Sequence, residues 1–231
     1  MYRTERRAGV CRLRGPTTRW LSSGTPGGYT DGRAAYNTTV SDGFDRTDLA
    51  RYAAERREAA GFTEPGRTLL TGVEQAHAVG ARLGPVTAVA TAGVSNPAAL
   101  PMDPAGGPLP EAGQPEQGTV NVLVGVARSL PDGALASLLA VVTEAKAATL
   151  LDRVGVPGTT SDAAVVGGAT DEPRVRFAGS GTEVGAAARA CVREAVAGSL
   201  DSRYDCETPP DSVAAAAHGL TTEARAETFE P

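Results

Sequence analysis

The chain has 231 residues and a formal net charge of −5, with 41% hydrophobic but only 4% aromatic residues. This length allows one large domain or two small ones, whose core has to be built from Ala, Val and Leu. The acidic balance, with no basic run beyond the first 19 residues, argues against nucleic acid as the main partner.

The cysteine content and the lack of long apolar segments indicate the cellular compartment of the protein. The three cysteines, Cys11, Cys191 and Cys206, are too few and too scattered for a disulfide framework or a thiolate metal site, so we expect no metal. No segment approaches the ~20 apolar residues of a membrane span, and the N-terminal residues lack an apolar stretch of signal-peptide length. We therefore expect a cytoplasmic protein without a membrane span, of undetermined oligomeric state.

Scarce residue types make a few polar positions informative. The chain has 21 Arg but a single Lys, Lys146, and its only Asn residues are Asn37, Asn96 and Asn121. Arg and Lys are not interchangeable, because only the ammonium loses its proton readily when it is desolvated. These four residues are therefore candidates for function, although chance could also have placed them.

The N-terminal part of the chain reads as strands. Residues 1–17 form a basic strand or arm, and short strands are expected at 8–14 and 18–23, joined at Gly15-Pro16. The glycine-rich run from Gly24 to Gly28 cannot be helical, so it is predicted to be a turn or a loop that approaches a ligand closely.

Strands and helices then alternate. A strand is predicted at 34–40, a helix at 47–60, a short helix at 68–82 and a buried strand at 85–94. The Pro/Gly-rich segment 101–117 follows as a surface loop that is longer than compact domains usually contain.

The segment from 118 to 168 predicts a strand, a helix and a strand. The apolar run 120–126 is followed by an amphipathic pattern over 132–151, in which Lys146 lies at the border of the apolar stripe. A strand at 163–166 comes next, and a hairpin through 169–174 is predicted to lead to a strand at 175–178.

The last predicted helix begins near Thr182. The preceding Gly179-Ser180-Gly181 only superficially resembles a phosphate-binding fingerprint. A Thr cap at a free helix N-terminus can still hold an anionic group or a developing oxyanion. Residues 204–231 read as an acidic, mostly disordered tail that is expected to be dispensable for activity.

The alternation of helices and strands predicts one α/β domain over residues 18–203, with a mixed sheet flanked by helices. The sheet is expected to be mixed because the 169–174 hairpin requires antiparallel pairing. The alternative is an α+β layered sandwich. Spacing alone indicates a site rich in Ser, Thr, Asn and one Lys at strand ends.

Six motifs, in order along the chain, resemble those of the adenosylcobinamide amidohydrolase family. They are Trp20 to Val40, Thr91 to Asn96, Gly118 to Val124, Thr143 to Lys146, Gly158 to Val165 and Ala178 to Gly185. The resemblance implies an amidohydrolase of cobalamin (vitamin B12) salvage. Such an enzyme hydrolyses the amide between the corrin-ring side chain and aminopropanol, giving adenosylcobyric acid.

The resemblance also implies the partners. The substrate is a small-molecule corrinoid that itself contains cobalt, and no other cofactor can be read from the residues. A non-catalytic corrinoid-binding protein with the same fold is the alternative function.

Amide hydrolysis needs a nucleophile, a base and donors for the oxyanion. The motifs supply catalytic candidates, namely Lys146, Asp162, Glu144, Thr160 and Ser23. They also supply candidates for substrate binding, namely Gly27, Gly28, Asn37, Asn96, Asn121 and Thr182. Two arrangements stay open: a Ser or Thr activated by a desolvated Lys, or a water activated by Asp162 or Glu144. About half of these residues are expected to be structural.

Overall fold

The computed structural model describes residues 1–41, 43–109, 119–216 and 218–230. Its main sheet contains eight strands. They are β1 (Arg3–Arg7), β2 (Val10–Ser22), β3 (Gly28–Thr39), β4 (Gly66–Thr71), β5 (Val79–Leu83), β6 (Val86–Ala92), β8 (Val120–Val126) and β10 (Ala163–Ala169).

The strand order is β4-β3-β2-β10-β8-β6-β5, with β1 paired to β2. The β8–β10 and β3–β4 pairs are parallel, and the other pairs in this sheet are antiparallel. This confirms the predicted single domain with a mixed sheet. A second, small sheet has the order β11-β7-β9 and is formed by β7 (Pro97–Ala99), β9 (Gly158–Thr159) and β11 (Leu220–Thr221).

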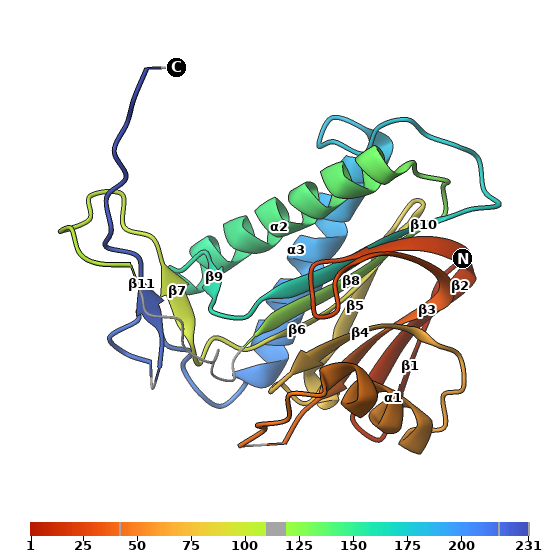
Figure 1. Cartoon of the computed structure of the whole chain (residues 1–231), viewed down its shortest axis with the longest axis horizontal. Helices are drawn as coiled ribbons and strands as arrows, with labels where there is room; N and C mark the ends of the chain where they lie inside the picture. Colours follow the sequence, from red (N-terminus) through yellow and green to blue (C-terminus); the bar gives the residue numbers. More distant parts are fainter. Residues whose placement is uncertain (42, 110–118, 217, 231) are drawn as a thin grey trace.

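Two long helices, α2 (Asp132–Val154) and α3 (Glu183–Arg203), lie side by side on one face of the main sheet (Figure 1). The shorter helix α1 (Leu49–Ala59) lies at the opposite side, near β3 and β4. The main core fills the space between the sheet and α2 and α3, where Leu135, Leu138 and Val142 of α2 are fully buried. Helix α2 ends at Gly155, whose positive φ of 71° is typical of a helix C-terminus.

Helix α2 bears on the expectation that no segment is long and apolar enough to span a membrane. In the described part of the chain it is the one helix long and apolar enough, by length and composition, to cross a membrane. Half of its most apolar window is buried inside the structure. Its apolar side packs on β10 and α3, so α2 has the packing of a core helix.

Three predicted elements are wrong in detail. Residues 68–82 contain β4, a 3-10 turn at Gln75–His77 and β5 instead of a helix, because pairing with β3 and β6 overrides a weak local pattern. The two N-terminal strands are one strand, β2, with a register shift between Arg14 and Thr18. Residues 175–178 form no strand, and β10 obtains its antiparallel partner from β2.

The curvature of the sheet determines which residues meet. Strands β3 and β8 are separated by β2 and β10 in the sheet order, yet the Asn121 Nδ2 of β8 donates to the Asn37 Oδ1 of β3 at 2.9 Å. Asn121 Nδ2 also donates to the Leu70 carbonyl of β4 at 2.8 Å. The sheet therefore curls back on itself, so that β3 and β4 face the start of β8.

Candidate active site

Four of the five predicted catalytic residues meet where α2 passes the N-terminal ends of β8 and β10, namely Lys146, Asp162, Ser23 and Thr160. Asp162 immediately precedes β10, and its Oδ1 accepts a hydrogen bond of 2.8 Å from the backbone N–H of Val120, the first residue of β8. Lys146 reaches the same carboxylate from α2, and its Nζ donates to Asp162 Oδ2. The sequence prediction that these two residues share a site is consistent with this geometry.

Four donors surround the Asp162 carboxylate. Besides Val120 and Lys146, Thr159 donates twice, from Oγ1 to Oδ1 at 2.5 Å and from its backbone N–H to Oδ2 at 3.1 Å. A carboxylate has about four acceptor positions, and all of them are occupied here. Asp162 is therefore a fixed anion that holds Lys146 and its own turn in place, rather than a free base for a water molecule.

Lys146 is a buried cation, with only 8% of its surface exposed. A charge in such a place requires a partner, and Asp162 supplies it. Gly158 leaves space for this ion pair, because a Cβ at that position would lie 2.7 Å from Asp162 Oδ2 and 3.1 Å from Lys146 Nζ. The sequence pattern predicted Lys146 at the border of the apolar stripe of α2, and in the structure this position is buried.

Two adjoining cavities connect the ion pair with the surface. A cleft of about 370 Å³ is lined by polar residues that include Ser23, Thr160 and Asp162, and by apolar residues that include Leu69 and Leu70. Ser23 and Asp162 also line a cavity of about 50 Å³ beside Lys146. The smaller cavity has room for about one water molecule, whose share of liquid volume is ~30 Å³.

Ser23 is the hydroxyl that borders both cavities. It follows β2 directly, and its Oγ accepts from Ala164 N at 2.9 Å while it donates to Ala164 O at 3.3 Å. Strand β10 therefore fixes the Ser23 hydroxyl at the entrance to Lys146. Thr160 lines the cleft as well, and its backbone N–H donates to Asn96 O at 3.1 Å.

The structure places other candidates away from the cleft. Glu144 is exposed on α2 and pairs with Arg189 of α3. Thr182 caps α3, because its Oγ1 accepts from Gly185 N at 3.0 Å and donates to Gly179 O at 2.8 Å. Gly27 ends the β2–β3 turn and Gly28 begins β3; neither is among the residues that line the cleft, whereas Gly24 and Thr25 of that turn are.

The three Asn residues are buried and differ in their partners. Asn37 and Asn121 bond to each other, and Asn37 Nδ2 also donates to Thr91 Oγ1 at 2.8 Å. Asn96 is 1% exposed, and neither of its side-chain polar atoms has a hydrogen-bond partner. None of the three lines the cleft, so the Asn37–Asn121 pair joins distant strands rather than facing a ligand.

Sequence reasoning missed Thr159 and Gly158, which hold the carboxylate and leave space for the ion pair. The signal for Thr159 is a Thr three residues before an Asp, a spacing at which a hydroxyl can close a turn. The apolar wall of the cleft was also missed, because the local pattern of residues 68–82 predicts a helix where the structure has β4. Among the described residues, no group of three or more His, Cys, Asp or Glu could hold a metal ion.

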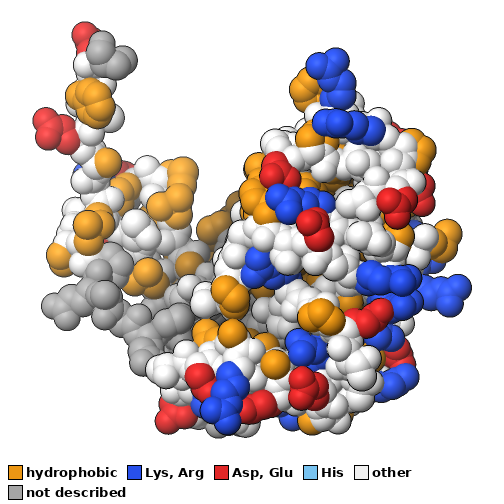
Figure 2. Space-filling model, turned by 45° about the vertical axis from the view of Figure 1, so that its right-hand side comes forward, with side chains coloured by type: hydrophobic (Ala, Val, Ile, Leu, Met, Phe, Trp, Pro, Cys, Tyr) orange, Lys and Arg blue, Asp and Glu red, His pale blue; other side chains and the backbone are white. Residues whose placement is uncertain are grey.

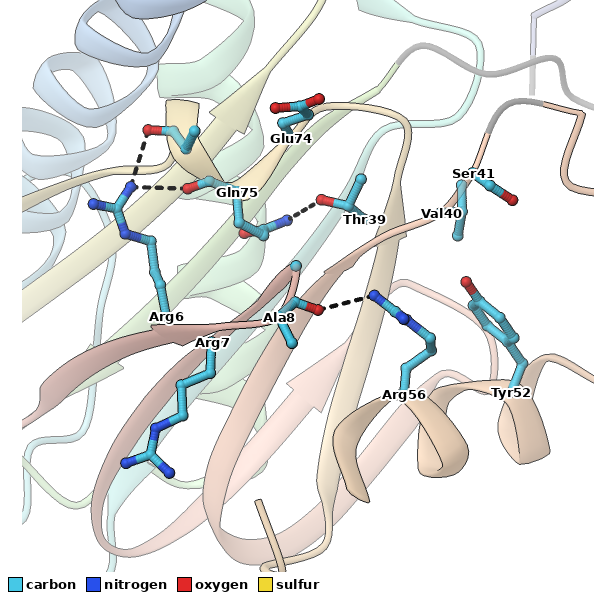
Figure 3. Close-up of a pocket in the computed structure, with 12 residues that line it drawn as sticks. Arg6, Arg7, Ala8, Thr39, Val40, Ser41, Tyr52, Arg56, Glu74 and Gln75 are labelled. Atoms are coloured by element: carbon cyan, nitrogen blue, oxygen red, sulfur yellow. Dashed lines mark hydrogen bonds between the residues drawn. The ribbon is translucent and has the colours of Figure 1, made fainter. Parts of the chain in front are cut away.

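A second pocket, of about 810 Å³, lies elsewhere on the sheet and contains none of the predicted residues (Figure 3). Two of its arginines, Arg6 and Arg56, are held by backbone carbonyls. Arg6 Nη1 donates to Gln75 O and Ala76 O, and Arg56 Nη2 donates to Ala8 O at 2.9 Å. These bonds join β1 and α1 to neighbouring segments, which is a structural role.

Comparison with known proteins agrees with the motifs. The family model described as adenosylcobinamide amidohydrolase matches residues 1–208, so the match includes the N-terminal residues. A Halobacterium salinarum protein named adenosylcobinamide amidohydrolase is 52% identical over 233 residues, covering 100% of both chains. A solved Burkholderia sp. beta-aminopeptidase is 15% identical and covers 84% of this chain and 79% of its own, with a TM-score of 0.43. The chain belongs to the adenosylcobinamide amidohydrolase family.

Proposed function

We propose that this protein hydrolyses the amide between the corrin-ring side chain and aminopropanol in adenosylcobinamide, releasing adenosylcobyric acid. The observation that carries the proposal is the identity of 52% over the full chain with a relative of that name. The Lys146–Asp162 pair beside a cleft supports it, because a buried charge pair at a cavity is typical of a reactive site.

The cleft accepts the amide arm of the substrate rather than the whole corrin. Its volume of about 370 Å³ is at the small end of ligand pockets, which span ~300–1,000 Å³. A corrin ring with its side chains is larger than a drug-sized ligand, so it has to lie outside the cleft. The hydroxyls of Ser23, Thr160 and Ser161 then face the aminopropanol arm, and the leucines of β4 contact its carbon atoms.

Lys146 is the electrophilic group of this arrangement. Asp162 accepts one of its ammonium hydrogens, and no other described residue accepts the remaining two, which lie beside the small cavity. A fixed cation in a site with little water stabilises the oxyanion that forms at the amide carbon. The same ammonium can donate the proton that the departing aminopropanol nitrogen requires.

Two nucleophiles fit the cleft. In one route Ser23 Oγ forms a bond to the amide carbon, Lys146 gives a proton to the departing nitrogen and takes up the proton of the Ser23 hydroxyl, the C–N bond breaks, and aminopropanol leaves. Water then hydrolyses the ester, which releases the carboxylic acid and returns the proton to Ser23. In the other route a water in the small cavity attacks directly. All acceptor positions of Asp162 are occupied, which favours the first route, because that route passes the proton through Lys146 and does not use the carboxylate as a free base.

The test is release of aminopropanol from adenosylcobinamide by the purified protein. Binding without release would instead identify a corrinoid-binding protein. A Ser23→Ala variant then separates the two routes, with Thr160→Ala as the matched hydroxyl control. We expect Ser23→Ala to lower turnover at least ~100-fold, and we expect Ser23 to carry the corrin acyl group in an intact-mass measurement after rapid quenching.

We also propose a cytoplasmic location and no resident cofactor. The three cysteines are free, as is usual in reducing compartments. Both the charge stabilisation and the nucleophile are supplied by side chains of the chain, so the only cobalt that the reaction needs is that of the substrate. On the face seen in Figure 2, acidic and basic side chains are interspersed without a large patch of one sign, which fits a small-molecule partner rather than nucleic acid.

A further inference from the structure

A short C-terminal segment lies against the chain that follows β6. Strand β11 pairs in parallel with β7, with Leu220 opposite Ala98 and Thr221 opposite Ala99. The next residue, Thr222, donates its backbone N–H to Ala99 O at 3.0 Å. Figure 1 shows β11 beside β7 at the edge of the molecule.

Two side chains extend this contact. Glu223 Oε2 accepts from Ala105 N at 2.7 Å, and Arg225 Nη2 donates to Asp103 Oδ1 at 2.8 Å. Arg225 also donates to Pro104 O at 2.5 Å. Residues 220–225, here named the C-terminal strap, therefore hold both ends of the segment 97–105.

Strand β7 connects the strap with the active site. Its other edge pairs antiparallel with β9, with Pro97 opposite Thr159 and Ala98 opposite Gly158. Just before β7, Asn96 O accepts the N–H of Thr160. Thr159 in turn holds the Asp162 carboxylate, so a continuous series of bonds joins the strap, β7, β9 and Asp162.

Asn96, the residue that precedes β7, is not fixed by hydrogen bonds of its own side chain. The Asn96 side chain is buried with neither polar atom bonded, and burial of an unpaired amide opposes this position of the chain. Two very short strands, β7 and β9, are also marginal on their own, because two-stranded sheets need further support. The strap supplies the third strand.

We propose that the C-terminal strap positions the Asp162 turn against Lys146. The consequence for turnover rests on the proposed function, and it reverses the expectation that the tail is dispensable. The strap lies beyond residue 208, where the match to the family model ends, while the Halobacterium salinarum relative aligns over its whole length. Residues 220–225 are thus positioning residues, since they act through β7 and β9 rather than on substrate.

The first test does not depend on substrate. Thr222→Pro removes the N–H that bonds to Ala99 O, and Ala226→Pro, just beyond the last contact of the strap, is its matched control. Hydrogen exchange is measured in peptides covering residues 156–163 and 120–126. We expect Thr222→Pro to raise the exchange rate of residues 156–163 about tenfold or more, and to leave the rate of residues 120–126 unchanged. The Ala226→Pro variant should exchange at the wild-type rate in both peptides. Equal exchange in 156–163 for all three proteins would overturn the proposal, whether or not the protein hydrolyses cobinamide.

The second test measures catalysis and rescue. We expect kcat of Thr222→Pro to fall about tenfold, while KM changes less than threefold, because the apolar wall from β4 is untouched. A chain ending at Gly219 should show the same defect, and a synthetic peptide of residues 220–231 added in excess should restore kcat. A kcat unaffected by the substitution, or a truncated chain that folds and is fully active without the peptide, would contradict the positioning role.

Discussion

Thr159 and Asp162 are joined twice within one turn, because the hydroxyl and the backbone N–H of Thr159 donate to different oxygens of the Asp162 carboxylate. This double contact fixes both the rotation of the carboxylate and the path of the chain before β10. Lys146 then binds an anion whose position is already set. Catalytic groups held by a rigid supporting shell need no reorganisation during the reaction.

Gly158→Ala tests the space around the ion pair. The new Cβ would meet Asp162 Oδ2 and Lys146 Nζ at distances that real structures rarely show, so one of the charged groups has to move. We expect turnover to fall at least about tenfold, since a misplacement of ~1 Å is enough to cost up to 100-fold. Gly181→Ala is the control, because a Cβ there meets nothing within 4 Å. Turnover of Gly158→Ala equal to that of the control would show that the ion pair tolerates displacement.

Lys146→Arg tests whether a compact ammonium is required. The guanidinium keeps the charge, but it is larger than the site beside Gly158, and it does not lose its proton. We expect turnover to fall by about 100-fold or more at equal folded concentration. If Lys146 were an exposed residue, the same substitution would change the free energy of unfolding by only ~0.5 kcal/mol. Arg153→Lys, at an exposed position of the same helix, is the control. Melting temperature is measured alongside, and near-native turnover of Lys146→Arg would refute the role.

The buried Asn residues should respond differently to the same substitution. Asn121→Leu leaves the Leu70 carbonyl and Asn37 Oδ1 without their donor, which we expect to lower the free energy of unfolding by about 2–4 kcal/mol. Asn96→Leu removes an amide that has no partner, so we expect a change below about 1 kcal/mol or a gain in stability. Urea unfolding of both variants gives the comparison. An Asn96→Leu variant as unstable as Asn121→Leu would mean that Asn96 has a bonded partner in solution.

Stability at low pH should depend on Glu64. The hydrogen bond from Arg14 Nε, at 2.7 Å, lowers the pKa of Glu64 below its ordinary value, with burial acting in the opposite direction. Its stabilising contribution is therefore complete above the unfolded pKa of about 4.3. The contribution is lost as the pH falls from there through the lower pKa of the folded protein.

Glu64→Gln measures this contribution. We expect the variant to be less stable than the wild type at pH 6, and the difference to shrink as the pH is lowered from 6 to 3. Glu227→Gln is the control, at an exposed position for which the described structure gives no ion pair. A stability difference that stays constant over this range would show that Glu64 does not titrate differently on folding.

The sequence alone determined the type of fold and the long helices, and it predicted Lys146 and Asp162 among the candidate catalytic residues. Strands β6 and β8 are buried on both faces and so read as continuous apolar runs, and α2 and α3 carry apolar stripes long enough to be unambiguous. Lys146 stood out because it is the only lysine in the chain. The family resemblance added Asp162 and Ser23 through their motifs.

Only the tertiary structure decided which polar residues face the cleft. Glu144 and Lys146 are two residues apart on α2, and therefore point to different sides of the helix, one to Arg189 and the other to Asp162. The three Asn residues look alike in the sequence, but the curl of the sheet brings two of them together and leaves the third unpaired. The strap is the extreme case, because Leu220 and Ala98 are brought together by pairing between short strands that carry no local signal of their own. Long-range contacts of this kind depend on how the whole sheet bends, and local sequence patterns do not encode that bending.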